Sequence, residues 1–288
     1  MLIDPQRHHF SLWASQILIS IFAVMLLPRQ FHMMVVENSD EKHVHTAMWL
    51  LPLYMMLITL FSLPIAAAGL LQELPKEWGD VFLLKLPHMH DKPWLTLTVF
   101  LGGFTASITM VMITALTLSI MTVNHILLPL ISRLAPLAFL RRYLLQCRWA
   151  VIALSLVAAH WFEQTIGNSY MLINMGIISF AAAAQFGPSF VGGMLWSRGN
   201  RTGALLGLSA GFFLWFYTLL LPSFMKSGWL DTSLIREGLF GIEALRPESL
   251  FGFLPGHSLA NSVFWSLAVN TMLYIIGSLW STPTETER

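Results

Sequence analysis

Residues 186–207 read FGPSFVGGMLWSRGNRTGALLG, two apolar runs separated by a short turn that carries Arg198 and Arg201. A long apolar segment that stops at a basic turn and then resumes is typical of a chain that crosses a membrane and returns. The same alternation of apolar runs and short polar segments is found along most of the sequence. We therefore take lipid as the main solvent of this chain.

Composition supports this interpretation and excludes several function classes. The chain has 288 residues, of which 56% are hydrophobic and 11% charged, with a mean hydropathy of +0.66; soluble domains carry about 25% charged residues. A net charge of +1 argues against nucleic-acid binding. The sequence lacks a phosphate-binding loop, a nucleophile elbow and a zinc motif, so we do not expect an enzyme and assign no catalytic residue or cofactor.

Seven apolar runs are long enough, or nearly so, to cross a hydrocarbon core of about 30 Å. Their backbone groups have no water to bind, and the runs do not alternate as the strands of a barrel would, so we predict helices. The expected fold is an all-α integral membrane protein with about seven transmembrane helices. The predicted spans are residues 10–27, 48–71, 94–123, 149–166, 170–196, 202–224 and 259–280.

The distribution of arginine and lysine predicts the orientation. Residues 132–148 and the turn at Arg198 and Arg201 are basic and contain no acid, whereas the loops of the opposite side mix acids with bases. By the positive-inside rule the N-terminus lies outside and the C-terminus lies in the cytoplasm. We expect one membrane domain over residues 1–281, followed by a polar cytoplasmic tail at 282–288.

The third span is rich in hydroxyl side chains that are candidate ligands for a small cation. Thr105, Ser107 and Thr109 lie close together, and Thr105 and Thr109 share one helix face. Hydroxyl oxygens suit an alkali ion, and transporters bind coupling ions near the bilayer midplane. The alternative is that these hydroxyls donate back to carbonyls of their own helix, or join helices together.

Two further places interrupt apolar runs with polar side chains. Pro28 is followed by Gln30 and His32, and Gln185 is followed by Gly187 and Pro188. Broken helices line the substrate cavities of transporters, so Gln30, His32 and Gln185 are candidate solute-binding residues. The alternatives are an ordinary helix end in the first case and a proline kink capped by Gln185 in the second.

Gly203, Gly207 and Gly211 recur at intervals of four residues in the sixth span. Small residues at this spacing let two helices approach closely, so we predict a packing face without chemistry. Arg198 and Arg201 are predicted to hold the preceding turn on the cytoplasmic side.

The stretch from Phe186 to Gly207 resembles the sodium:solute symporter family, through Phe186-Gly187-Pro188, Trp196-Ser197-Arg198 and Gly203-Ala204-Leu205. LPRQFHMMVVEN resembles the segment after the family's seventh helix, and FLGGFTASITMVMITALTLSIMTVNHILLPL resembles its ninth helix. Together with FGIEALRPESLFG, the pattern is most similar to the symporter-like input domains of bacterial sensor histidine kinases.

The resemblance implies part of a leucine-transporter-like, inverted-repeat bundle, with the seven spans matching helices seven to thirteen of the family. It implies sodium as the ion, at the positions of Ile108 and Thr109; Thr109 matches and Ile108 has no oxygen, although Ser107 adjoins it. It also implies partners: a small polar solute, membrane lipid, and either the N-terminal half of a transporter or a histidine kinase.

Three functions stay open at this stage. The first is a transporter that couples sodium to uptake of a small polar solute, or a part of one. The second is the sensory input module of a histidine kinase, and the third is an inactive fragment. A neighbouring reading frame for six more spans would favour the first, and a kinase frame the second.

Overall fold

The computed structural model describes residues 9–166, 170–252 and 257–281, and in these ranges the secondary structure consists of helices without a strand. The prediction of an all-α membrane protein is confirmed at this level. The tail predicted at 282–288 lies outside the described residues.

Contacts divide the chain into two compact units, one comprising Met1–Phe31 with Val157–Arg288 and the other His32–Leu156. The boundary passes through α7. In the first unit the helices are α1 (His9–Leu26), α2 (Pro28–Phe31), α8 (Tyr170–Ala184), α9 (Gly187–Leu195), α10 (Arg201–Trp215), η5 (Phe216–Leu220), α11 (Leu221–Lys226), α12 (Ser233–Glu237), η6 (Leu239–Gly241), η7 (Glu243–Leu245), η8 (Pro247–Gly252) and α13 (Ser258–Trp280). In the second they are η1 (His32–Val36), α3 (Glu41–Leu71), η2 (Lys76–Val81), α4 (Phe82–Met89), α5 (Pro93–Thr122), η3 (Val123–Leu127), α6 (Leu128–Arg133), η4 (Ala135–Tyr143) and α7 (Leu144–Ile166).

Six helical stretches among the described residues are long and apolar enough to span a membrane. The helices Phe10–Leu26 and Pro28–Val36 are bent by 46° relative to each other, and they add a seventh span if the pair is counted as one. The bend follows from Pro28, which has no N–H to continue the helix. The six stretches are Glu41–Leu71, Pro93–Arg133, Ala138–Gln164, Asn174–Leu195, Arg201–Lys226 and Ser258–Trp280.

The apolar surface of α3 identifies its surroundings. None of the 18 residues in its most apolar stretch is buried, and Trp49, for example, is 82% exposed. A water-soluble protein rarely exposes so much contiguous apolar surface. This chain is therefore a multi-pass, membrane-embedded protein.

Two close contacts join helices of the second unit. Gly69 of α3 lies under the ring of Phe82 in α4, where a Cβ would come within 2.2 Å of the ring. The hydroxyl of Ser119 in α5 donates to the carbonyl of Arg148 in α7 over 2.9 Å. The helical stretch containing α5 has 41 residues, or about 60 Å at 1.5 Å per residue, so it extends beyond the hydrocarbon core.

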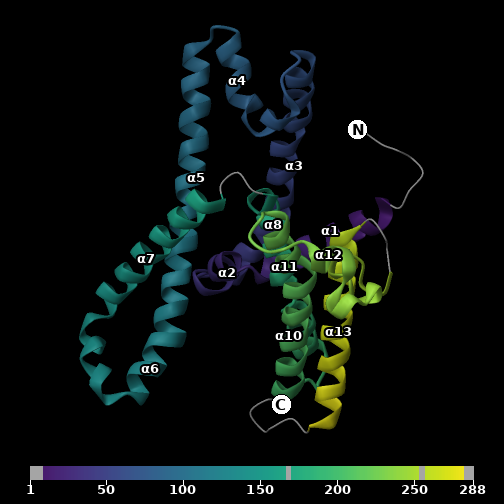
Figure 1. The fold of residues 1–288 in the computed structure, drawn as a ribbon. Coiled ribbons are helices and arrows are strands. Elements are labelled where there is room, and N and C mark those ends of the chain that lie inside the picture. Colours follow the sequence, from purple (N-terminus) through teal and green to yellow (C-terminus); the bar gives the residue numbers. More distant parts are fainter. Residues whose placement is uncertain (1–8, 167–169, 253–256, 282–288) are drawn as a thin grey trace. The chain divides into compact units, whose positions relative to one another are not determined.

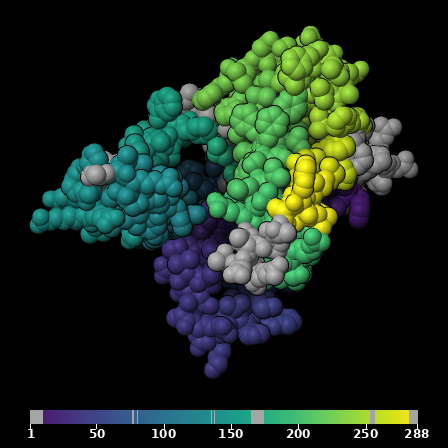
Figure 2. Space-filling model, turned by 90° about the horizontal axis from the view of Figure 1, so that it is seen from below, coloured from purple at the N-terminus to yellow at the C-terminus, as the bar shows by residue number. Residues whose placement is uncertain are grey.

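In the first unit, α10 and α13 lie side by side and run in opposite directions (Figure 1). From below, the surface of α13 lies against that of α10 (Figure 2). Gly203, Gly207 and Gly211 are buried on the α10 face that meets α13. A Cβ built on Gly203 would lie 2.1 Å from Ser278 Oγ and 2.5 Å from the carbonyl oxygen of Tyr274. The absence of side chains therefore sets the distance between the two helices.

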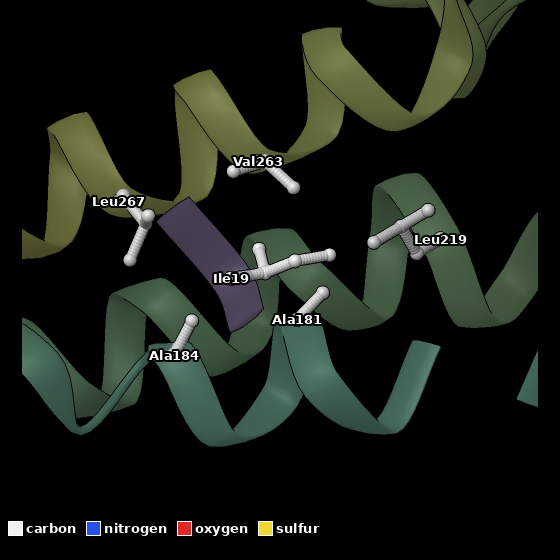
Figure 3. Packing of buried hydrophobic residues seen from close by; sticks show 6 residues of the cluster. All are labelled: Ile19, Ala181, Ala184, Leu219, Val263 and Leu267. Atoms are coloured by element: carbon white, nitrogen blue, oxygen red, sulfur yellow. The ribbon is translucent and has the colours of Figure 1, made fainter. Parts of the chain in front are cut away.

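Helix α1 packs against other helices of the first unit through Ile19, which is 2% exposed. In Figure 3 its side chain lies between Ala181 and Ala184 of α8 and Val263 of α13, with Leu219 and Leu267 nearby. Small residues on α8 leave the space that the Ile19 side chain fills. This cluster fixes α1 close to the polar side chains described next.

The described part of the segment between α11 and α13 forms short helices. Tyr217 donates its hydroxyl to the carbonyl of Leu245, and Lys226 forms an ion pair with Glu248. Buried Leu250 donates its N–H to Asn261 Oδ1 of α13. The described part of the segment is thus tied to the helices beside it.

Candidate functional site

The span Asn174–Leu195 is interrupted near its middle. Helix α8 ends at Ala184 and α9 begins at Gly187, and across the break the N–H groups of Gln185 and Phe186 each reach back three residues, to Ala182 and Ala183. Pro188 has no N–H to donate to the carbonyl of Ala184, so a regular helix cannot continue here. The break leaves polar backbone groups within an apolar span.

Gln185 lies at this break and is 1% exposed. Its Nε2 donates to the carbonyl of Ala181 over 3.2 Å and to Ser266 Oγ of α13 over 3.0 Å. Asn270 of α13 donates from Nδ2 to the backbone oxygen of Gln185 over 2.7 Å and to its Oε1 over 3.2 Å. We refer to Gln185, Ser266 and Asn270 as the polar cluster.

One acceptor of the polar cluster has no hydrogen-bond donor among the described residues. Asn270 is fully buried, and its Oδ1 has no partner. Gly207 lies beside this oxygen, because a Cβ there would come within 2.8 Å of it. A buried acceptor without a donor is unfavourable by about 1–3 kcal/mol, so this oxygen would gain from a donor or a cation brought by a ligand.

The polar cluster contains amides and a hydroxyl and no titratable group. Such groups can accept from and donate to an uncharged polar molecule, and their oxygens can ligate a small alkali ion. They cannot act as general acid or base near neutral pH. The arrangement therefore suits binding rather than catalysis.

The hydroxyls predicted to bind an ion are placed differently. Thr105, Ser107 and Thr109 lie on α5 with exposed side chains, and each donates to the carbonyl four residues earlier, over 2.7, 2.9 and 2.8 Å respectively. This is the alternative left open by the sequence. No further ligand joins these hydroxyls among the described residues, so sodium binding at this place stays a prediction.

Of the other predicted cavity residues, Gln30 lies half-buried in α2 and His32 is buried in η1. The Nε2 of His32 is 3.1 Å from Glu37 Oε1. Gln185 is thus the predicted cavity residue that lies in the polar cluster. In the described chain, no group of three His, Cys, Asp or Glu side chains is placed to hold a metal ion.

The residues predicted to shape the turn and the packing lie at several places in the first unit. Gly187 lies against Phe22 of α1, at a distance where a Cβ would come within 2.6 Å of the ring. Arg198 and Arg201 are exposed at the turn between α9 and α10. Gly211 lies next to Gln185 Oε1, which a Cβ would approach to 2.5 Å.

Three important residues were missed by the sequence analysis. Ser266 and Asn270 complete the polar cluster, and a lone asparagine in the apolar run LAVNTML was the available signal, because amides at membrane depth usually have a function or a partner. Asn200 accepts from the N–H of Gly203 over 2.9 Å, which caps α10. Its position directly before an apolar run is the usual signature of such a cap.

No family model, curated protein or solved structure matches this chain. The likeness to sodium:solute symporters therefore stays a prediction.

Proposed function

We propose that this protein is a membrane transporter of the sodium:solute symporter class, or part of one, that moves a small polar solute across a bacterial inner membrane. The observation that supports this most is the break at Gln185, where a buried cluster of uncharged polar groups includes an acceptor without a donor. Interrupted helices that present polar groups near the bilayer midplane are a recurrent feature of secondary transporters.

The position of the polar cluster is consistent with such a site. Gln185 is near the middle of the span Asn174–Leu195, and Asn270 is near the middle of the span Ser258–Trp280. In our proposal the amides of Gln185 and Asn270 exchange hydrogen bonds with the solute, and sodium is the coupling ion. Thr105, Ser107 and Thr109 remain its predicted ligands, within a leucine-transporter-like bundle.

The test is uptake by the purified protein in liposomes, with labelled neutral amino acids, sugars and small carboxylates offered under a sodium or a potassium gradient. We expect one class to accumulate under the sodium gradient. Gln185→Leu and Asn270→Leu should each lower the uptake rate about tenfold or more, because each removes an amide that is proposed to form hydrogen bonds with the solute.

Gln146→Leu and Asn124→Leu are the matched controls, since both side chains are exposed, and both variants should keep the wild-type rate. A thermal unfolding curve for each variant separates lost transport from lost folding. If no solute class accumulates, or if folded Gln185→Leu transports as fast as the wild type, the proposal is wrong.

A further inference from the structure

An apolar groove of about 490 Å³ lies on the first unit, between α1, α9 and α13. Phe22, Val191, Leu267 and Ile275 are among the side chains that line it, and Val191 and Ile275 are 41% and 42% exposed. In a membrane-embedded protein such a groove is filled by hydrocarbon or by another helix. The chemistry at its end distinguishes the two.

One end of the groove meets the turn between α9 and α10. Trp196 and Tyr274 both line the groove, and their rings meet edge to face with centroids 5.9 Å apart. Gly199 lies directly against Tyr274, since a Cβ there would come within 2.3 Å of the Tyr274 hydroxyl. Arg198 thus lies in the turn two residues after Trp196, a lining residue of the groove. Trp196 and Tyr274 are aromatic residues of the kind found at the membrane–water interface.

The turn between α9 and α10 is positively charged. The turn and the start of α10 carry Arg198 and Arg201 and no acidic residue. Arg198 is exposed and forms no ion pair in the part of the chain that the structure describes. Glu243 and Glu248 pair with bases in the segment after α11, some 35–40 Å away along the helical stretch Arg201–Lys226 at 1.5 Å per residue.

We propose that this groove is a binding site for an anionic phospholipid. One acyl chain lies in the groove along α9 and α13, and the phosphate lies at the turn, where Arg198 binds it and Arg201 adds positive charge. Trp196 and Tyr274 lie at the level where the acyl chains join the headgroup. Basic pockets between transmembrane helices are suited to anionic headgroups.

Charge complementarity favours an anionic lipid over the other occupants. A zwitterionic lipid carries a cation on its headgroup, which the two arginines would repel. An apolar helix from a second copy would fill the groove and leave Arg198 without an anion. A free phosphate ion would use the arginines and leave the groove empty.

The test is native mass spectrometry of the full chain in detergent, offered equal amounts of phosphatidylglycerol and phosphatidylcholine with identical acyl chains. We expect the wild type to retain phosphatidylglycerol preferentially. Arg198→Gln should lower that retention about fivefold, the effect of one cation near a membrane surface, and Arg198→Lys should preserve most of it. Val191→Trp, which fills the groove, should abolish retention of both lipids.

The controls are Arg141→Gln and Val157→Trp, at exposed positions on η4 and α7, which should behave as the wild type. Inorganic phosphate should not displace the lipid. Equal retention of the two lipids by the wild type would overturn the proposal, and so would unchanged retention in Val191→Trp. A lipid-free dimer that Val191→Trp dissociates would also overturn it and would identify a second copy as the occupant.

Discussion

At Gly207 the backbone of α13 comes so close to α10 that a Cβ would lie 2.7 Å from the carbonyl oxygen of Asn270. Gly193, on α9, has nothing within 4 Å of the same built atom. Both glycines are helical, so both lose backbone freedom on folding to the same extent. The atoms around the position of the added methyl group, and not the helix itself, should therefore decide how replacing each glycine with alanine changes stability.

Gly207→Ala should therefore lower the free energy of unfolding by about 1–3 kcal/mol, because a helix backbone must move to make room. Gly193→Ala should instead be neutral or stabilise by about 0.5–1 kcal/mol, since alanine is the better helix former. Thermal unfolding in detergent, with both variants measured in parallel, makes the comparison. Equal effects of the two changes would contradict the close contact.

The sequence predicts which residues share a helix face, but it does not predict which atoms from distant parts of the chain they contact. The four-residue spacing of Gly203, Gly207 and Gly211 indicates a common face, and the structure places that face against α13. The spacing of Thr105 and Thr109 also indicates a common face, but it does not show where each hydroxyl donates, because a carbonyl of the same helix is always within reach. The partner of Gln185 could not be predicted because Asn270 lies 85 residues away.

At the scale of the helices, the start of α10 is stabilised by Asn200, the residue directly before it. Asn200 caps α10 through the N–H of Gly203, and its Nδ2 also donates to the carbonyls of Ser278 and Ser281 over 3.1 and 2.9 Å. The side-chain amide of Asn200 thus provides hydrogen-bond partners both for an N–H group at the start of α10 and for carbonyl groups at the end of α13. Asp40 caps α3 through the N–H of Lys42 alone and is exposed.

We expect Asn200→Ala to destabilise the protein by about 2–4 kcal/mol, the sum of a lost cap and of two carbonyls left without donors. Asp40→Ala should cost about 1 kcal/mol or less, because water replaces the exposed cap. Chemical unfolding of both variants in the same detergent measures the difference. An Asn200 variant no less stable than the Asp40 variant would show that the amide does not join the two helices.

The existence of each span was predictable, because hydropathy is a property of a local stretch and lipid imposes helix on it. The ends of the spans were less so. The helical stretch of α5 continues to Arg133, past the predicted end at residue 123, since helix continues outside lipid wherever the sequence permits. The break at Gln185 was predicted, with a proline kink as the alternative, but its hydrogen bonds to Ser266 and Asn270 of α13 were not, because these residues lie 81 and 85 positions away in the sequence.

For the whole molecule, the orientation across the membrane remains a prediction that a single experiment can test. Cys147 is the only cysteine, so a Cys147→Ser background allows one cysteine to be introduced at a time. In intact bacterial cells, a membrane-impermeant maleimide should label Asp231→Cys and should label Ser132→Cys only after permeabilisation. Both positions are exposed, and the positive-inside rule places them on opposite sides.

The Cys147→Ser parent, which has no thiol, is the control for background labelling. Labelling of Ser132→Cys in intact cells, with Asp231→Cys protected, would reverse the assigned topology. Labelling of both positions would show that at least one intervening stretch does not cross the membrane.

For the whole molecule, composition was sufficient to predict that the chain is embedded in a membrane. The unburied apolar stretch of α3 agrees with this prediction, because such a surface is stable in lipid and not in water. Composition carries no information on how helices group. The division of the chain into Met1–Phe31 with Val157–Arg288 and His32–Leu156 depends on contacts between residues distant in sequence, such as that between Ile19 and Val263.

The glycine contact between α10 and α13 also limits how this protein can evolve. Every amino-acid replacement at Gly203 adds at least a Cβ, so no smaller substitution exists at this position. Trimming Ser278 to glycine in the same gene would remove the Oγ at 2.1 Å, but the Tyr274 carbonyl at 2.5 Å would remain. Replacement of Gly203 therefore requires the α13 backbone to move. Related sequences should keep this glycine after the surrounding apolar residues have been replaced.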